Sequence, residues 1–265
     1  MKIIISHDVD HLRMGEHLKD TFLGGSILRT AKGLLKSSIS FSQAMKRFSL
    51  ELNRVKELHE FNAQYGVRET FFFGMRKGLN LSYEYNDAFP LIKYLLDNDV
   101  LVGLHGMGYN SIELLKEERD RIASVLPVNY PLGIRNHYLR KDANTLSIMD
   151  KLGFVFDSTD YHLVAPHKVG NMWEIPISVM DAGFISHYKN DMDLLKQQTA
   201  AKLNEAMQLS LPFFVINFHD AYFNEGYPDF HKWYTWLVPY LKERDFRFIN
   251  FSEAIKELNA DLIHK

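Results

Sequence analysis

Residues 2–11 read KIIISHDVDH, a run of apolar residues that ends in two acidic residues. Such a run predicts a buried strand. Because side chains alternate between the faces of a strand, Asp8 and Asp10 are expected to point the same way from its carboxyl end. Two carboxylates held together there repel each other unless a cation or a shared proton compensates. The arrangement favours a metal-dependent hydrolase, with one acid as a ligand and the other as a base.

The composition of the chain excludes several classes of protein. Its 265 residues suffice for one α/β barrel or two smaller domains, and 46% of them are hydrophobic, which excludes general disorder. The formal net charge of −2 argues against binding of nucleic acid through a broad basic field. The absence of cysteine excludes disulfides, cysteine nucleophiles and thiolate zinc sites, so any metal must be held by His, Asp, Glu or Tyr.

The N-terminal segment lacks the pattern of a secretory signal. No basic region precedes a long apolar stretch there, and Asp8 and Asp10 interrupt the apolar run early. No apolar segment approaches the roughly 20 residues that a membrane span requires. We therefore expect a soluble, cytoplasmic protein, and the sequence leaves its oligomeric state open.

Short apolar segments alternate with helix-like segments along the chain. Strands are expected at residues 2–6, 69–73, 101–104, 133–136, 154–157, 172–177, 213–218 and 246–251. Helices are expected at residues 50–64, 87–98, 112–125, 143–152, 192–209, 230–242 and 252–259, the last with Ser252 as its cap. This alternation predicts an α/β fold, a (β/α) barrel of seven to eight strands in a single domain over residues 1–265.

A long insertion, at about residues 13–49, follows the first strand. It is rich in apolar residues, and its charged residues are mostly basic: Arg13, Lys19, Arg29, Lys32 and Lys36 against Glu16 and Asp20. We favour a helical cap packed on the rim of the barrel. The alternative is an amphipathic surface that contacts anionic lipid or a lipid-linked substrate, which would make the protein a peripheral membrane partner.

Polar residues gather where the predicted strands end. Catalytic residues of such barrels lie at the carboxyl ends of the strands, so these side chains are expected to form one site. They are Asp8, Asp10, His105, Arg135, His137, Asp157, Glu174, His219 and Asp220.

Taken in order, these segments resemble the motifs of the polysaccharide deacetylase family, the NodB-homology carbohydrate esterases. Residues 6–10, SHDVD, are similar to the first motif in its Asp-x-Asp form, and residues 69–73, ETFFF, to the second strand. Residues 103–109, GLHGMGY, lie where the family has a His-x-x-x-His motif. Residues 133–138, GIRNHY, resemble the Arg-x-Pro-Tyr motif, and residues 218–220, FHD, match the last motif. Residues 156–158, FDS, and 173–176, WEIP, resemble later strand ends, so the resemblance spans nearly the whole chain.

The resemblance implies a distorted (β/α) barrel that removes acetyl groups from glycans with a divalent metal, most suitably Zn²⁺. It implies that Asp8 is the catalytic base and Asp10 a metal ligand. His105 would be a second ligand, Arg135 would orient the base, and His219 would be the catalytic acid.

Two positions depart from the family pattern. Tyr109 replaces the second metal histidine, and His137 replaces the proline of the third motif. Tyr109 would bind a metal well only with its phenol deprotonated, and that phenol normally has a pKa near ~10. We hypothesise that His137 supplies the missing nitrogen from an adjacent strand end, with Tyr109 as the other candidate.

Further residues are expected to support the site. Tyr109, Tyr138, Trp173 and Tyr222 are candidate substrate-binding residues, because aromatic faces suit stacking on sugar rings. Asp157, Glu174 and Asp220 are candidates for residues that contact and orient the catalytic residues without touching the substrate. For Asp157 and Glu174, ordinary capping of the barrel rim is an equal alternative.

The sequence therefore predicts a metal-dependent deacetylase acting on an N-acetylated sugar or glycan, in the biosynthesis of a surface polysaccharide such as O-antigen or lipopolysaccharide. One alternative is a pseudoenzyme that binds a glycan or a partner without hydrolysis, because one metal histidine is replaced. Another is an amidase on a small non-sugar amide, which the same residues would serve.

Overall fold

The predicted opening strand is β1 (Lys2–Val9), and it lies inside a curled sheet of nine strands. The computed structural model describes residues 1–188 and 191–263. Along the sheet the strand order is β6-β7-β5-β4-β3-β2-β1-β9-β8, and every neighbouring pair is parallel except β6 with β7. The remaining strands are β2 (Thr70–Gly74), β3 (Leu101–Gly106), β4 (Gly133–Asn136), β5 (Phe156–Asp157), β6 (His167–Val169), β7 (Met172–Glu174), β8 (Val179–Met180) and β9 (Phe213–Asn217).

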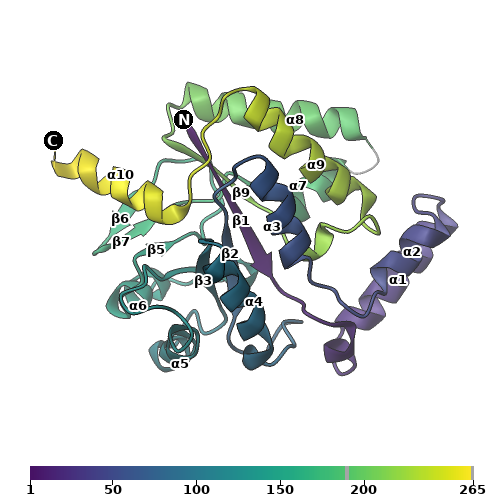
Figure 1. The fold of residues 1–265 in the computed structure, drawn as a ribbon, viewed down its shortest axis with the longest axis horizontal. Helices are drawn as coiled ribbons and strands as arrows, with labels where there is room; N and C mark the ends of the chain where they lie inside the picture. The colour runs from purple at the N-terminus through teal and green to yellow at the C-terminus, as the bar shows by residue number, and fades with distance from the viewer. Residues whose placement is uncertain (189–190, 264–265) are drawn as a thin grey trace.

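Helices surround this sheet (Figure 1). Most of them follow a parallel strand, as the right-handed crossovers of α/β folds require. They are α3 (Val55–Gln64), α4 (Tyr85–Asp97), α5 (Ile112–Ala123), α6 (Thr145–Lys151), α7 (Asp181–Tyr188), α8 (Met192–Gln208), α9 (Pro228–Glu243) and α10 (Phe251–Ile263). Short 3₁₀ turns lie at Met14–His17, His137–Leu139 and Asp220–Tyr222. None of the described helices is long and apolar enough to cross a lipid bilayer.

The two faces of the sheet build two cores. Ile3 and Ile5 face the surrounding helices and belong to the larger apolar cluster, whereas Ile4 faces the hollow of the curled sheet. In that hollow, Ile4 lies in a cluster with Phe156 of β5 and Phe251, the first residue of α10. Alternation along β1 therefore turns the side chains of the even-numbered residues, Asp8 among them, into the hollow above an apolar floor.

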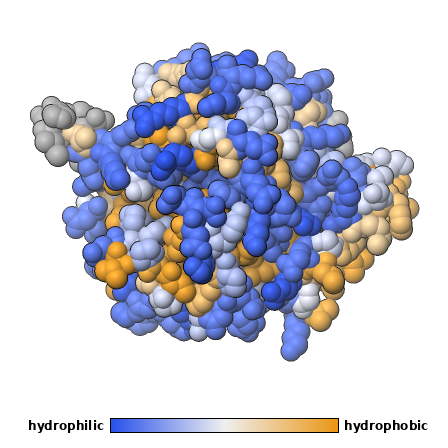
Figure 2. Space-filling model, viewed as in Figure 1, coloured by the Kyte–Doolittle hydropathy of each residue, from blue (hydrophilic) through white to orange (hydrophobic). Residues whose placement is uncertain are grey.

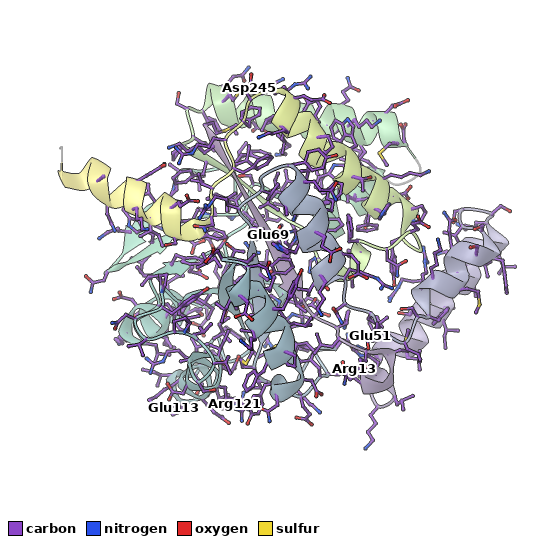
Figure 3. All side chains as sticks on the ribbon, in the orientation of Figure 1. Arg13, Glu51, Glu69, Glu113, Arg121 and Asp245 are labelled. Carbon is purple, nitrogen blue, oxygen red and sulfur yellow. The ribbon has the colours of Figure 1, made fainter. Side chains whose placement is uncertain are left out.

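The insertion forms two helices, α1 (Phe22–Leu35) and α2 (Phe41–Arg47), which project from the body of the molecule as a separate lobe (Figure 1). Its two ends are held together by Arg13 and Glu51. These residues form an isolated antiparallel bridge, and Arg13 Nε lies 3.5 Å from a carboxylate oxygen of Glu51 (Figure 3). The insertion therefore leaves and rejoins the barrel at one place.

The α/β fold class is confirmed, and the sheet is a curled half-barrel with β6 and β8 at its edges. The strand expected at residues 246–251 is reduced to one bridge between Phe248 and Ile3. Asn250 ends it, because its side chain accepts from the Glu253 amide at 3.0 Å while Glu253 accepts from the Asn250 amide at 3.0 Å. This reciprocal cap starts α10, so Asn250 and not Ser252 is the capping residue. Strands β6 and β8 and helix α7 were not predicted, because each is short and lacks a periodic pattern.

Candidate metal centre and catalytic site

A cavity of about 500 Å³ opens at the carboxyl ends of the central strands. Asp8 and Asp10 from the end of β1, His105 from β3, His137 after β4 and His219 after β9 all line it. Because these strands are parallel and adjacent, residues far apart in sequence meet at one edge of the sheet. The volume is typical of a site for a small molecule or a sugar unit.

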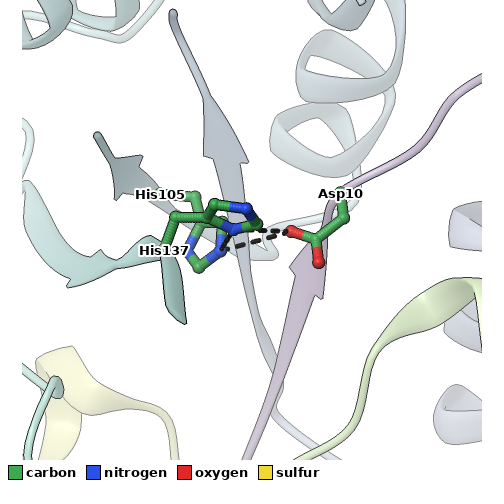
Figure 4. A group of neighbouring side chains, drawn as sticks. All are labelled: Asp10, His105 and His137. Carbon is green, nitrogen blue, oxygen red and sulfur yellow. Dashed lines mark hydrogen bonds and ion pairs between the residues drawn. The ribbon is translucent and has the colours of Figure 1, made fainter. Parts of the chain in front are cut away.

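Asp10, His105 and His137 form one compact group of potential metal ligands (Figure 4). A carboxylate oxygen of Asp10, Oδ1, lies 3.2 Å from His105 Nε2 and 3.3 Å from His137 Nδ1. The two ring nitrogens are 3.0 Å apart. Both histidines are buried, whereas Asp10 is partly exposed to the cavity. Three donors therefore converge on one point and leave a side open to the cavity.

Main-chain carbonyls orient both histidines. His105 Nδ1 lies 3.0 Å from the carbonyl oxygen of Arg135, and His137 Nε2 lies 3.0 Å from that of Leu79. A carbonyl only accepts, so each of these nitrogens donates its proton. In the neutral rings the nitrogens that face Asp10 therefore carry lone pairs, which is the tautomer that binds a metal.

The group fits a divalent cation. Among the described residues, Asp10 Oδ1 is buried and has no hydrogen-bond donor, although two ring nitrogens lie within 3.3 Å of it. A carboxylate and two imidazole lone pairs would repel one another without a positive charge between them. Two histidines and one carboxylate, with a further position open, form a donor set that suits Zn²⁺ in catalytic sites.

Asp8 lies beside this group and is held as an ionised carboxylate. Its Oδ1 accepts from a guanidinium nitrogen of Arg135 at 2.9 Å, and its Oδ2 accepts from Asn217 Nδ2 at 2.7 Å. Burial alone would raise the pKa of Asp8, but Arg135, followed by His105 and His219, together outweigh burial and lower that pKa. Arg135 is itself fully buried and is held by two further bonds to Ser158.

His219 faces both acids of β1. Its Nε2 lies 3.7 Å from Asp10 Oδ2 and 4.0 Å from Asp8 Oδ2, whereas its Nδ1 lies 2.8 Å from Asp181 Oδ1. Burial alone would lower the pKa of His219, but Asp181, followed by Asp10 and Asp8, raises it to about 10. His219 is therefore protonated at neutral pH and points its Nε2 proton toward the cavity.

The backbone beside His137 is strained. Tyr138 has a φ of 55°, and Leu79, whose carbonyl orients His137, has a φ of 48°. Such left-handed conformations cost a residue other than glycine roughly 1–2 kcal/mol. The cost falls on the two segments that place the ring of His137.

The structure separates the four aromatic candidates for substrate binding. Tyr138 and Tyr222 line the cavity. Tyr109 does not line it: its ring lies 4.4 Å from the guanidinium of Arg140. Its phenol accepts from Arg140 at 3.3 Å, so Tyr109 lies apart from the group of metal ligands. Trp173 is buried in the inner core, because alternation along β7 turns it into the hollow of the sheet below the site.

The three supporting acids take different places. Asp157 of β5 pairs with Ile134 of β4 and with Glu174 of β7. Paired residues of neighbouring strands point to the same face, and Arg135, next to Ile134, points to the other one. Asp157 and Glu174 therefore lie on the face of the sheet opposite the Arg135 side chain. Burial, then the charge of Asp157, raises the pKa of Glu174 well above its usual value. Asp220 lines the cavity, and one of its oxygens accepts from the amide of Arg54 at 2.8 Å.

Two residues at the site, Asn217 and Asp181, were missed in the sequence. Asn217 stands two residues before His219, so the alternation that links Asp8 with Asp10 would have placed it on the same face. Asp181 follows β8, a two-residue strand without a sequence signature. His219 thus pairs with Asp181, whereas Asp220, its neighbour in sequence, bonds elsewhere.

Neither a protein-family model nor a curated protein matches the sequence. The structure is similar to that of a candidate polysaccharide deacetylase from Mycobacterium smegmatis, with a TM-score of 0.65 at 16% identity over 98% of this chain and 90% of that chain. The protein has the polysaccharide deacetylase fold.

Two further structures share this deacetylase fold. A candidate polysaccharide deacetylase from Pseudomonas aeruginosa PAO1 aligns with a TM-score of 0.58 at 13% identity, over 96% of this chain and 88% of that one. An allantoinase aligns with a TM-score of 0.60 at 10% identity, over 98% of this chain and 89% of its own. The resemblance found in the sequence is thereby confirmed at the level of the fold. These neighbours carry different names, and a shared fold does not by itself determine a reaction.

Proposed function

We propose that this protein is a metal-dependent deacetylase that removes the acetyl group of an N-acetylated sugar during assembly of a surface polysaccharide such as O-antigen. The observation that carries the proposal is the approach of two histidine nitrogens, His105 Nε2 and His137 Nδ1, to Asp10 Oδ1, a buried oxygen that has no hydrogen-bond donor among the described residues. Beside it, one cavity also holds an ionised carboxylate, Asp8, and a protonated imidazole, His219. A metal site, a proton acceptor and a proton donor in one cavity are the groups that metal-assisted hydrolysis of an amide uses.

Asp10, His105 and His137 would hold the cation, with Zn²⁺ as the best match to their donor atoms. When bound, a divalent cation lowers the pKa of water and polarises a carbonyl oxygen, which favours attack of water on an acetyl group. The main-chain carbonyls fix the tautomers of both histidines in advance, so the site needs no rearrangement of these ligands.

Asp8 and His219 would move the protons of the reaction. Asp8 accepts a proton from water as the water oxygen forms its bond to the acetyl carbon. Arg135 and Asn217 hold Asp8 in place through both of its oxygens. His219 then gives its Nε2 proton to the amide nitrogen as the carbon–nitrogen bond breaks. Acetate and a free amino sugar leave the site.

The insertion belongs to the proposed functional unit. Phe22 and Arg29 of α1 and Arg47 of α2 line the same cavity as Asp10, so residues 1–265 are proposed to work as one domain. Tyr138 and Tyr222 offer aromatic faces to a sugar ring there. We also propose a peripheral membrane contact through α1 and α2, whose outer surface carries exposed apolar residues (Figure 2).

The metal content of protein purified without chelators tests the ligand set. We expect near one zinc per chain, lost in Asp10→Ala, His105→Ala and His137→Ala. Loss of an outer residue that supports a ligand typically weakens metal binding by about 10–100-fold. Loss of a ligand itself should weaken zinc binding by at least that factor. His162→Ala, which removes an exposed histidine outside the site, is the matched control. Unchanged zinc content in His137→Ala would exclude His137 as a ligand, and no zinc in the wild-type protein, even with excess metal, would favour a glycan-binding pseudoenzyme.

Acetate release from a panel of N-acetylated sugars tests the reaction. Asp8→Asn should lower turnover by about 10²–10⁴-fold, because it removes the proton acceptor and keeps the shape of the side chain. Full turnover in Asp8→Asn would contradict the roles given above. The similarity to an allantoinase justifies adding small non-sugar amides to the panel. Hydrolysis of the small amides, without hydrolysis of any N-acetylated sugar, would favour the alternative that the protein is an amidase.

A further inference from the structure

Two arginines of the insertion line the cavity of the proposed active site. Arg29 comes from α1 and Arg47 from α2, and both contribute to the wall of the cavity that contains Asp10. Neither belongs to a strand end or to a motif of the barrel. The insertion thus adds two positively charged side chains that the proposed reaction does not use.

The surroundings of Arg47 fix it without neutralising it. Its Nε donates to the carbonyl oxygen of Gly226 at 2.6 Å, and its guanidinium lies 4.8 Å from the centre of the Tyr227 ring. The side chain is half-buried, so it has lost part of its hydration. A bond to a carbonyl and an aromatic ring position the guanidinium but leave its charge uncompensated.

Arg29 is also without a countercharge. One of its terminal nitrogens donates to Ser26 on the same helix at 3.2 Å. Among the residues that the structure describes, no carboxylate lies within the 4.0 Å ion-pair distance of Arg29 or Arg47. Asp229 attracts Arg47 from beyond that distance, while Arg29 repels it.

Two guanidinium groups on one cavity wall repel each other, and half-burial of one of them adds to the cost. Burial first, and then the charge of Arg29, lower the pKa of Arg47. An anion bound between them would remove this penalty. A guanidinium presents paired N–H donors that match phosphate oxygens, and a phosphate ester carries close to the two negative charges that two arginines require.

We propose that Arg29 and Arg47 bind a phosphoryl group of the substrate, so that the acetylated sugar treated by this site is a sugar phosphate or diphosphate ester. The proposal rests on the proposed deacetylase function for the sugar, but the anion site is defined by the arginines alone. The phosphoryl group can belong to a nucleotide or to a lipid carrier, because both present the same diphosphate to the two guanidinium groups.

Calorimetric binding to the complete, metal-loaded protein tests the proposal. The probes are N-acetylglucosamine 1-phosphate, pyrophosphate and neutral N-acetylglucosamine. We expect Arg29→Gln and Arg47→Gln each to weaken binding of both phosphate probes by about tenfold, with no change for the neutral sugar. Arg47→Lys should recover part of the loss, because it keeps the charge and loses the paired donors.

Arg244→Gln is the matched control. Arg244 also lies over a tyrosine ring, 3.7 Å from the centre of Tyr240, and donates to a carbonyl, but it does not line the cavity. The proposal is overturned if both glutamine variants bind phosphate probes as the wild type does, or if the wild type binds none of them. It is also overturned if Asp10→Ala alone abolishes binding, because the phosphate then occupies the metal site. An N-acetylated uronic acid could also bind more tightly than the phosphate probes, with the same loss of binding in the two arginine variants. That result would mean that the arginines bind a carboxylate and not a phosphate.

Acetate release separates this proposal from the deacetylase function. Binding of phosphate probes that depends on the arginines, without acetate release from any probe, would contradict the deacetylase function and leave the anion site intact. Equal kcat/KM for neutral and phosphorylated sugars, unchanged in Arg29→Gln and Arg47→Gln, would overturn the anion site and leave the function intact. Preference between uridine diphosphate N-acetylglucosamine and a short-chain prenyl diphosphate N-acetylglucosamine would identify the source of the phosphate.

Discussion

Asp8 and Asp220 are buried in the same cavity wall, and their surroundings push their pKa values in opposite directions. Asp8 has a guanidinium at 2.9 Å and an amide donor at 2.7 Å, and its pKa is lowered. Asp220 has one main-chain donor, the Arg54 amide, and its second oxygen is buried without a donor among the described residues. Burial raises the pKa of Asp220 to about 8, and the nearby charge of Asp10 adds to the effect. One acid is therefore ionised and the other protonated at neutral pH.

This difference predicts how stability changes with pH. The folded pKa of Asp220, about 8, exceeds its ordinary value of 3.8, so the folded chain holds a proton that the unfolded chain has lost between these pH values. The contribution of Asp220 to the free energy of unfolding therefore falls as the pH rises from about 4 to 8. Asp220→Asn keeps the acceptor for Arg54 and cannot ionise. At pH 9 it should be more stable than the wild type by on the order of 1–3 kcal/mol in urea unfolding with chelator present.

At pH 4 the two proteins should unfold at similar urea concentrations, because Asp220 is then neutral in the folded state. A constant difference between wild type and Asp220→Asn across this pH range would contradict the raised pKa of Asp220. Such a result would mean that the substitution acts through packing.

At the level of strands and helices, glycines make room for the aromatic floor beneath the site. A side chain at Gly133 of β4 would place its first carbon 2.1 Å from the ring of Phe156, and one at Gly103 of β3 would meet Phe72 at 2.5 Å. The ring of Phe156 stacks on Phe251, with centres 4.6 Å apart. The small strand residues thus let β5 and the start of α10 close the hollow of the sheet.

Replacement of Gly133 by alanine should therefore destabilise the fold. The added methyl group forces the Phe156 ring and its stacked partner to move, which typically costs about 1–3 kcal/mol. Gly183→Ala in α7 is the matched control, since nothing lies within 4 Å of the added carbon there. That substitution should stabilise the helix by roughly 0.5–1 kcal/mol. Urea unfolding of both variants measures the difference, and equal midpoints for the two would refute this packing argument.

The elements that the sequence predicts are the ones that carry their own pattern. Strands β1, β2, β3 and β9 are runs of apolar residues buried on both faces, and these runs were recognised directly. Strands β6 and β8 have three residues or fewer, and partners elsewhere in the sheet determine them. Asp181, which bonds to His219, follows one of these short strands and could not be foreseen. The meeting of His137 with Asp10 and His105 was a hypothesis in the sequence, and the structure brings the three side chains together.

At the scale of the whole molecule, the insertion gives the protein an uneven surface. The lobe of α1 and α2 exposes apolar residues on its outer side (Figure 2), among them Leu28, Leu35 with 87% of its surface accessible, and Phe41 with 73%. The exposed lysines Lys32 and Lys36 accompany them. Apolar residues flanked by basic ones match the surface of an anionic membrane, which is the basis of the proposed peripheral contact.

Sedimentation with phosphatidylglycerol vesicles checks this contact. The triple variant Leu28→Ser, Leu35→Ser, Phe41→Ser should reduce the bound fraction by at least about tenfold, since each side chain loses on the order of 1 kcal/mol of apolar burial in the lipid interface. Val128→Ser is the control, because Val128 is 91% exposed on another part of the surface. Wild-type protein that stays in the supernatant, or a triple variant that sediments equally, would rule out lipid contact through this lobe.

The use of main-chain carbonyls to orient His105 and His137 has a consequence for how such a protein changes over generations. Every amino acid brings a carbonyl, so exchanging the side chains at Arg135 or Leu79 does not delete the acceptors that hold the two rings. The orientation of the two rings therefore depends on the path of the backbone, whereas the Arg135 side chain is needed for another reason, its bond to Asp8. The sequence around a histidine can change in this way while the orientation of its ring is kept.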